Sequence, residues 1–331
     1  MGKPSVSVVI PAYNAKRTIG LTLQALIRQT YDGPLEIIVV DDGSNDHTFD
    51  FVQAFSDVLY IRQSNQGPAV ARNRGFRASK GEYVFFTDSD CIPEAQWIEK
   101  GLAGFIDPDI GVVCGSYGIA NPEHLLARCI HQEILYRHKN LMPDFPKAFG
   151  SYNFCVKRKV FEEVGGFTET YRNPSGEDND LSYKILRSGA RIYFSRYCIV
   201  EHFFPTRVGK YLREQFRHGF WRVPMYRDHP SMAVGDDYTF WKDILEPPLC
   251  MAMGAMLLLG IFADQDVYFL AIGLMAGLSA IEMFFAFAMT QTKKTTIFFA
   301  FVMLLRSFFR TAGFLLGVFQ IFSSRAPQKT H

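Results

Sequence analysis

The sequence predicts an α/β fold: a mostly parallel sheet flanked by helices, followed by hydrophobic helices in the C-terminal part of the chain. Up to about residue 205, short runs of Val, Ile and Leu alternate with segments in which apolar residues recur at helical spacing. Such alternation is typical of chains that build a parallel sheet with helices on its faces. From residue 249 to residue 322 the composition shifts to Leu, Phe, Met, Ala and Gly with few charges, which indicates a separate hydrophobic region.

Uninterrupted apolar runs predict four buried strands in the first 90 residues, at Val6–Ile10, Leu35–Val40, Val58–Ile61 and Glu82–Phe86. Helices are expected at 19–27, from the spacing of apolar residues, and at 68–79, where Pro68 suits the first turn. Pro93 is expected to open another helix. Farther along, strands are expected at 110–117, 151–156 and 191–194, and helices at 124–138 and 181–186.

Composition and charge limit the classes of protein to consider. The 331 residues are 48% hydrophobic, enough for one large or two smaller domains. The net charge of +2 is too small to indicate a nucleic-acid partner. Six cysteines without a C-x-x-C pair are expected to be free core thiols in a reducing compartment. The chain begins with a strand rather than the apolar core of a signal peptide, so its N-terminal domain is expected in the cytosol.

Polar clusters follow three of the expected strands at their carboxyl ends: Pro11–Asn14, Asp41–Ser44 and Asp88–Asp90. In open parallel sheets, ligands bind beyond the carboxyl ends of the strands. Asp88 and Asp90 are separated by one residue where a strand becomes a loop, so their carboxylates can converge on one Mg²⁺ or Mn²⁺ ion. Such ions commonly bridge protein carboxylates to substrate phosphates. The sequence therefore predicts a metal-bound nucleotide at this edge.

Several nucleotide-binding classes lack their motif here. A dinucleotide-binding enzyme needs G-x-G-x-x-G after the first strand, where this chain has Pro11-Ala12-Tyr13-Asn14-Ala15. A sugar nucleotidyltransferase needs a Gly-rich basic loop at the same place, and the P-loop of an NTPase does not occur in the sequence. The nucleotide must therefore be held in another way.

Five short motifs occur in order: VSVVIPAYN at 6–14, DDGS at 41–44, TDSD at 87–90, GGF at 165–167 and GED at 176–178. Together they resemble the family 2 inverting glycosyltransferases of GT-A fold, over roughly residues 5–205. The resemblance implies a metal-dependent enzyme that transfers a hexosyl or N-acetylhexosaminyl group from a nucleotide sugar, with a UDP-sugar favoured. It also implies a GT-A catalytic domain at 1–205 and a role in glycan biosynthesis.

By this resemblance, Pro11, Ala12 and Tyr13 flank the nucleotide base, and Asp41 accepts a hydrogen bond from it. Asp42 or Ser44 helps to shape the pocket; the alternative is that residues 41–44 form only a tight turn, which Asp, Gly and Ser favour. Arg72 either contacts phosphate or pairs with Asp41 or Asp88, and the loop containing Asn153 lies under the donor sugar. The residues expected to bind the donor are Pro11, Ala12, Tyr13, Asn14, Asp41, Asp42, Ser44, Arg72, Asp88, Ser89 and Asn153.

The same resemblance assigns the metal ligands and the base. Asp90 would ligate the metal in a D-x-D motif, with Asp88 on the ribose or a metal-bound water and His202 as a further metal or phosphate ligand. A lone histidine is otherwise a structural residue, so that alternative stays open. Asp178 would be the general base that accepts the proton of the acceptor hydroxyl, with Glu177 as the second choice. The alternative for both acids is helix capping alone.

The C-terminal third predicts attachment to a membrane. Residues 206–246 contain a basic, aromatic, amphipathic segment that suits an anionic membrane surface, although an ordinary solvated helix face is the alternative. Residues 247–323 contain three apolar stretches, at 249–263, 267–290 and 296–322, of which only the last two are long enough to span a bilayer. The third includes Arg306 and Arg310, so it either spans or lies in the interface with its arginines toward lipid phosphate. A polar tail follows at 324–331.

The charges of the linkers predict an orientation. The linker 263–266 is acidic and the linker 290–294 is basic, so the second is expected on the cytosolic side with the catalytic domain. The predicted function is a glycosyltransferase of the cytoplasmic membrane that acts on a hydroxyl of a lipid-linked or membrane-delivered acceptor. Two alternatives stay open: a polyprenyl-phosphate sugar synthase, which needs no base, and a non-catalytic membrane scaffold with a degenerate transferase fold.

Overall fold

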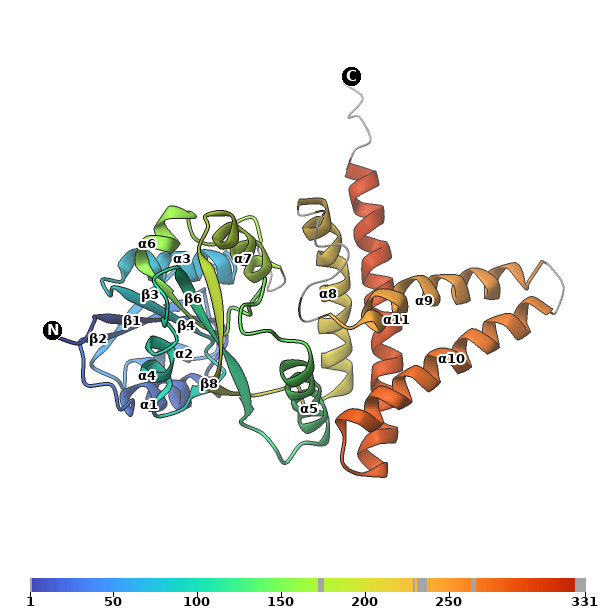
Figure 1. Ribbon diagram of the computed structural model, residues 1–331, viewed down its shortest axis with the longest axis horizontal. Helices are drawn as coiled ribbons and strands as arrows, with labels where there is room; N and C mark the ends of the chain where they lie inside the picture. The colour runs from blue at the N-terminus through green and yellow to red at the C-terminus, as the bar shows by residue number, and fades with distance from the viewer. Residues whose placement is uncertain are drawn as a thin grey trace, which may run out of the picture. The chain divides into compact units, whose positions relative to one another are not determined.

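The computed structural model describes residues 2–171, 176–228, 230, 237, 239–262 and 266–324, and these form two compact units (Figure 1). The sheet unit comprises Met1–Asn121 and Met142–Phe203. The helical unit comprises Pro122–Leu141 and Phe204–His331. The chain therefore leaves the sheet unit at residue 122, contributes one helix to the helical unit, and returns to the sheet unit.

The sheet unit contains one eight-stranded sheet in the order β3-β2-β1-β4-β7-β6-β8-β5. The strands are β1 Val6–Ala12, β2 Leu35–Asp41, β3 Val58–Arg62, β4 Tyr83–Thr87, β5 Cys91–Pro93, β6 Ile110–Ile119, β7 Asn153–Lys157 and β8 Arg191–His202. The pairings β1–β2, β1–β4, β2–β3 and β6–β8 are parallel, and β4–β7, β6–β7 and β5–β8 are antiparallel.

The α/β fold class is confirmed, and the sheet is more mixed than the apolar runs suggest. The strand β7 lies antiparallel between β4 and β6, because it enters the sheet after an excursion of the chain rather than after a βα crossover. The expectation of a helix at Pro93 is wrong: Pro93 ends β5, and helix α4 begins four residues later at Trp97 and ends at Leu102. An edge strand tolerates Pro because its N–H is not needed in the ladder.

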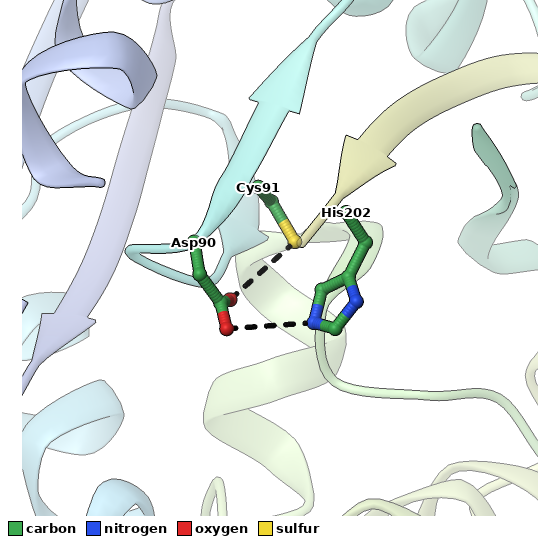
Figure 2. A group of neighbouring side chains, drawn as sticks. All are labelled: Asp90, Cys91 and His202. Atoms are coloured by element: carbon green, nitrogen blue, oxygen red, sulfur yellow. Dashed lines mark hydrogen bonds and ion pairs between the residues drawn. The ribbon is translucent and has the colours of Figure 1, made fainter. Parts of the chain in front are cut away.

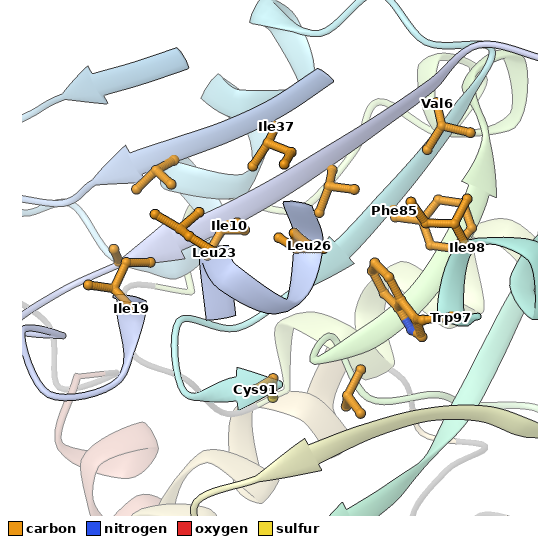
Figure 3. Close-up of a cluster of buried hydrophobic side chains, with 14 of the residues drawn as sticks. Val6, Ile10, Ile19, Leu23, Leu26, Ile37, Phe85, Cys91, Trp97 and Ile98 are labelled. Atoms are coloured by element: carbon orange, nitrogen blue, oxygen red, sulfur yellow. The ribbon is translucent and has the colours of Figure 1, made fainter. Parts of the chain in front are cut away.

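Helices cover both faces of this sheet and bury alternate residues of its strands. On one face α1 (Ile19–Ile27) and α4 pack on Val8, Ile10 and Phe85 (Figure 3). On the other face α3 (Pro68–Ala78), α6 (Arg158–Glu163) and α7 (Glu177–Arg187) pack on residues that include Val9. The short helix α2 (Thr48–Val52) follows β2.

Helix α3 approaches β1 closely at Gly75. A Cβ atom there would lie 2.3 Å from the Val9 side chain, so any larger residue would push the helix away from the sheet. This close packing fixes the position of Arg72, one turn earlier on α3, whose side chain is buried. The fold thereby carries a buried arginine to the site described below.

The helical unit is built from α5 Leu125–Asn140, α8 Val208–Asp228, α9 Trp241–Leu259, α10 Asp266–Met289 and α11 Lys293–Ser324. Helices α10 and α11 are long and apolar enough to cross a membrane. Helix α8 runs along α11 at backbone contact: a Cβ atom on Gly219 would meet the Arg310 carbonyl, and one on Gly313 would meet the Phe216 carbonyl. Small residues permit such close pairs of helices. The linker residues 263–265 and the tail 325–331 lie outside the described residues.

Charged residues of the apolar helices are paired inside the helical unit. Arg306 of α11 binds both carboxylate oxygens of Glu133 on α5, at 2.7 and 2.9 Å. Arg310 binds the Gln215 side chain of α8 at 2.7 Å. One of the two alternatives had these arginines turned toward lipid phosphate, but in the structure α5 and α8 supply protein partners for them.

Candidate active site

The loops after β1 and β2 are joined by hydrogen bonds at the carboxyl edge of the sheet. Ala12 and Asp41 are opposite each other in the β1–β2 register. The Asn14 amide N–H donates to the Ser44 hydroxyl at 2.8 Å, and the Asn45 N–H donates to the Asn14 side chain at 2.9 Å. Pro11 and Ala12 are buried, whereas Tyr13 is 51% exposed. The structure thus brings the two predicted base-binding motifs into one surface.

Asp41 and Asp42 hold this surface in place by different contacts. The Asp41 carboxylate accepts the Ser44 N–H at 2.7 Å and the Tyr60 hydroxyl at 2.5 Å. Burial, and then the bond to Asp41, raises the pKa of Tyr60, so Tyr60 stays protonated as a donor. The Asp42 carboxylate accepts hydrogen bonds from the Gln63 side chain, the Gln66 N–H and the Gly67 N–H, each at 2.8 Å. Asp42 therefore shapes the loop that leads into α3.

A buried ion-pair bridge connects the D-x-D motif to the acidic start of α7. Arg72 donates to the Asp88 carboxylate at 2.7 Å and to the Glu177 carboxylate at 3.1 Å. Arg72 and Glu177 are both buried, while the Asp88 side chain is 31% exposed. Burial alone would lower the pKa of Arg72, but Asp88 and Glu177 outweigh it and raise that pKa. The sequence left phosphate, Asp41 and Asp88 open as partners of Arg72. In the structure Arg72 pairs with Asp88 and also with Glu177.

Asp178 follows Glu177 in the first turn of α7 and is only partly buried. Burial, and then the neighbouring Glu177 carboxylate, raises the pKa of Asp178 to about 7. A carboxylate poised near neutral pH is suited to accept a proton from a hydroxyl. Glu177 is held by Arg72, so its charge is already compensated inside the protein. Glu177 and Asp178 are adjacent in the chain but lie in different environments. The environment of Asp178 is the one that suits a general base.

Asp90 and His202 face each other where β4 gives way to β5 and where β8 ends (Figure 2). The His202 Nε2 atom lies 3.5 Å from the Asp90 carboxylate. The Cys91 sulfur lies 4.0 Å from the other Asp90 oxygen, and ligand atoms of all three residues lie within 4.8 Å of one another. The backbone supports this corner: the Ser89 carbonyl accepts the Thr22 hydroxyl at 3.1 Å.

This donor set fits a divalent cation. A carboxylate and an imidazole at this separation suit Mn²⁺ and also Mg²⁺ completed by water and phosphate oxygens. The Cys91 thiol is fully buried, and burial, and then Asp90, raises its pKa well above the ordinary value. We therefore take Asp90 and His202 as the residues that would hold the ion.

Asn153, expected in the loop under the donor sugar, is buried at the start of β7. Its side chain is 1% exposed. Its carbonyl accepts the Trp97 indole N–H at 2.8 Å, and its amide donates to the carbonyls of Ser116 and Cys198 at 3.0 and 2.8 Å. These bonds join β7 to α4, β6 and β8, so the amide serves the core and not a sugar.

Two contributors were not expected from the sequence. Tyr60 lies in the middle of β3, and no residue near it in the sequence signals its bond to Asp41. The pairing of Arg72 with Glu177 spans 105 residues, so no local motif could indicate it. A buried arginine in a helix whose apolar face packs on the sheet is the signal that was available, since buried charges require partners.

Comparison with known proteins agrees with this site. The family model described as glycosyl transferase family 2 matches residues 7–165. Glycosyltransferase AglE of Haloferax volcanii is 30% identical over 230 residues, which are 67% of this chain and 74% of that protein. The chain belongs to glycosyltransferase family 2. It is also 30% identical over 239 residues to the pre-mycofactocin glycosyltransferase of Mycobacterium tuberculosis, covering 69% of this chain but only about half (49%) of that relative's length.

A solved structure resembles the fold over nearly the whole chain. The mannosyltransferase PcManGT from Pyrobaculum calidifontis, in complex with GDP-Man and Mn²⁺, superposes with a TM-score of 0.59 at 20% identity. The match covers 96% of this chain and 88% of that one. At this identity the likeness shows the fold alone, and the fold is of GT-A type. The glycosyltransferase family assignment implies binding of a nucleotide sugar.

Proposed function

We propose that this chain is a membrane-bound inverting glycosyltransferase that moves a sugar from a nucleoside diphosphate sugar to a hydroxyl of a lipid-linked or membrane-delivered acceptor. One observation supports this above the others: Arg72 joins Asp88 of the D-x-D motif to Glu177, the neighbour of Asp178. The carboxylates that would face the donor phosphates and the carboxylate that would face the acceptor are thus held at one edge of the same sheet.

In this proposal Asp178 accepts the proton of the acceptor hydroxyl while the hydroxyl oxygen attacks the anomeric carbon. The bond from that carbon to the diphosphate breaks on the opposite face, so a single displacement inverts the configuration. A divalent cation bound at Asp90 and His202 would stabilise the negative charge that develops on the departing phosphate. Arg72 holds the Asp88 carboxylate in place, and Tyr60 with Ser44 orients Asp41 toward the base-binding surface.

The identity of the donor is also a proposal. A UDP-sugar is the first choice, and GDP-mannose is the second because the similar mannosyltransferase was solved with it. The apolar helices α10 and α11 support a membrane-delivered acceptor, with the sheet unit on the cytosolic side. Asp178, with its pKa near 7, favours a hydroxyl acceptor over the already anionic phosphate of a polyprenyl-phosphate sugar synthase.

The test uses the purified full chain in detergent with a panel of UDP- and GDP-sugars, each with Mn²⁺, with Mg²⁺ and with a chelator. We expect one nucleotide class to raise the melting temperature in a metal-dependent way, because a ligand that binds only the native state stabilises it. Slow metal-dependent hydrolysis of the same sugar nucleotide should accompany this shift. If no sugar nucleotide is bound or hydrolysed with either metal, the enzyme proposal fails and the scaffold alternative replaces it.

A further inference from the structure

Helix α11 exposes an apolar stripe along one side of its length. Ile297, Phe301, Leu315 and Phe319 are all exposed, and at about 100° per residue they fall on the same side of the helix. The opposite side is buried and contains Arg306 and Gly313. The described part of the helical unit buries none of these four side chains, which lie in the first and last thirds of α11.

The α9–α10 hairpin leaves α11 from the side of that stripe. Leu304 and Phe308, which continue the stripe from Phe301, pack against Cys250 and Met253 of α9 and Leu278 of α10. Figure 1 shows the hairpin projecting from α11, whereas α8 runs alongside it. Both limbs of the hairpin expose apolar side chains: Leu257, Leu258, Ile261, Phe262, Phe269, Leu270 and Ile272. The stripe and the hairpin therefore present apolar surface to one common side.

The opposite side of α11 is polar at its middle. Tyr211 of α8 contacts Arg306, and Gln215 contacts Arg310. Between and beside these residues, Arg213 and Arg217 of α8 are exposed. If α11 crossed a bilayer, α8 would go with it and would place these two arginines at the level of the hydrocarbon core, where exposed charge is costly. The structure therefore argues against α11 as a span.

The hairpin has a different geometry. Lys242 of α9 binds Glu246 at 2.7 Å and Glu282 of α10 at 2.9 Å, and all three side chains are buried, so one cation bridges two carboxylates where the limbs meet. Helix α9 continues for thirteen positions from Glu246 to Leu259, and α10 runs sixteen positions from Asp266 to Glu282. At 1.5 Å per residue the two apolar limbs are about 20 and 24 Å long, against a hydrocarbon thickness of ~30 Å.

We propose that α11 lies along the surface of a lipid bilayer with its apolar stripe in the hydrocarbon edge, and that only the α9–α10 hairpin enters the bilayer. This rests on the membrane attachment proposed above and specifies its form: both ends of α11 stay on the side from which the hairpin enters. Lys293 and Lys294, exposed at the start of α11 beside the stripe, match anionic headgroups. Arg213 and Arg217 then remain in water.

The test is the sidedness of the two ends of α11 in the membrane-embedded full chain. Single cysteines are introduced as Thr292→Cys and Ser324→Cys, and a membrane-impermeant maleimide is applied to spheroplasts and to inside-out vesicles. The six native cysteines are buried, so the unmodified chain serves as the background control. We expect both new cysteines to react from the same side. Reaction from opposite sides overturns the inference, and it leaves the proposed transferase activity unaffected.

A depth profile distinguishes contact of the stripe with the bilayer from contact with a protein partner. Spin labels at Phe301, Ala312 and Phe319 should show equal, shallow immersion in vesicles that contain anionic lipid, and a label at Leu258 of the hairpin should be deeper. A label at Ile106, which is equally apolar and 67% exposed in the sheet unit, is the control and should stay in water. A profile deepest at the middle of α11, or stripe labels that lipid does not affect, contradicts the inference. Release of the whole chain by a salt wash would instead refute the membrane attachment itself.

Discussion

The sheet unit and the helical unit both bury arginines in ion pairs, but Arg72 of the sheet unit has one paired acid in reach of solvent, whereas Arg306 of the helical unit has a buried one. Arg72 is buried, yet its partner Asp88 is partly exposed and Asp178 next to Glu177 is only partly buried. Arg306 is buried, and its partner Glu133 is buried as well. The first arrangement holds reactive carboxylates at a surface. The second joins α5 to α11 and has no open side.

The electrostatics of the acids differ in the same way. Burial would raise the pKa of Glu133, but Arg306 and Arg137 outweigh it and lower that pKa to about 2. Asp178 is raised to about 7 because Arg72 only partly offsets burial and the charge of Glu177. A fully paired acid stays ionised at every physiological pH, whereas an acid near neutrality can exchange a proton. The lowered pKa of Glu133 therefore fits a role in stabilising the fold, whereas the raised pKa of Asp178 fits a role in proton transfer.

The largest effect should come from removing Asp90, the proposed metal ligand of the sheet unit. Asp90→Asn should lower the rate of sugar transfer about a thousandfold, because a bound cation contributes several kcal/mol to the transition state. Steady-state transfer with saturating metal measures this. Asp57→Asn, an exposed acid of the same unit, is the matched control and should be neutral. A D90N enzyme with normal, metal-dependent turnover would remove Asp90 from the site.

Breaking the network of the helical unit should affect stability rather than chemistry. Glu133→Ala leaves Arg306 and Arg137 without their shared carboxylate, and unpairing such buried charges costs about 3–5 kcal/mol. Chemical unfolding in detergent measures this loss of stability. The rate of donor hydrolysis per folded molecule should stay unchanged. The double variant Glu133→Leu with Arg306→Leu should recover part of it. An unchanged unfolding midpoint for E133A would show that the pairing contributes nothing.

The pH dependence should show opposite trends for activity and for stability. With the pKa of Asp178 at about 7, turnover should fall about tenfold per pH unit below 7 as the base becomes protonated. Because this pKa is raised above its unfolded value of 3.8, the native state binds the extra proton between pH 4 and 7. The contribution of Asp178 to stability is therefore complete below pH 4 and is lost as pH rises to 7.

Rate profiles and unfolding midpoints over pH 4–9 measure both trends. In Asp178→Asn the stability trend over this window should disappear. A wild-type turnover that is flat down to pH 5 contradicts the raised pKa.

The smallest effect is expected at an exposed pair of the sheet unit. Arg77 and Glu169 lie 3.4 Å apart, with side chains 61% and 46% exposed. Exposed pairs contribute about 0–1 kcal/mol, so Arg77→Ala should shift the unfolding midpoint little and turnover not at all. A thermal melt compared with that of E133A gives the contrast directly. A loss as large as that of E133A would mean that exposure does not separate the two kinds of pair.

The sequence was informative wherever a short run of residues determined both the fold and the chemistry. The apolar runs and the polar residues after them predicted three strand ends to within two residues, because a strand end and its ligand-binding residues are adjacent in the chain. The predicted ends are Ile10, Val40 and Phe86, and the observed ends are Ala12, Asp41 and Thr87. The structure also places His202 beside Asp90, and the family resemblance had suggested His202 as a further ligand there. The roles of these residues remain predictions.

Features that depend on contacts between distant residues were not predictable in this way. The Asn153 amide lies on a strand that was expected, but its three partners come from α4, β6 and β8, so only the tertiary structure shows that it serves the core. The sequence also does not show that α5 belongs to the helical unit, because an amphipathic helix does not indicate which surface its polar face meets. Arg306 and Arg310 were open to a lipid interpretation because Glu133 lies over 170 residues earlier.

The central claim is that Asp178 acts on the acceptor and not on the donor. It is tested most directly by measuring donor affinity and sugar transfer in the same preparation of Asp178→Asn. We predict donor binding, followed by calorimetry in the presence of Mn²⁺, within about twofold of the unmodified chain, and transfer to a hydroxyl acceptor reduced by a factor of about 10²–10⁴. Normal transfer by D178N, or loss of donor binding in parallel with transfer, would contradict the claim.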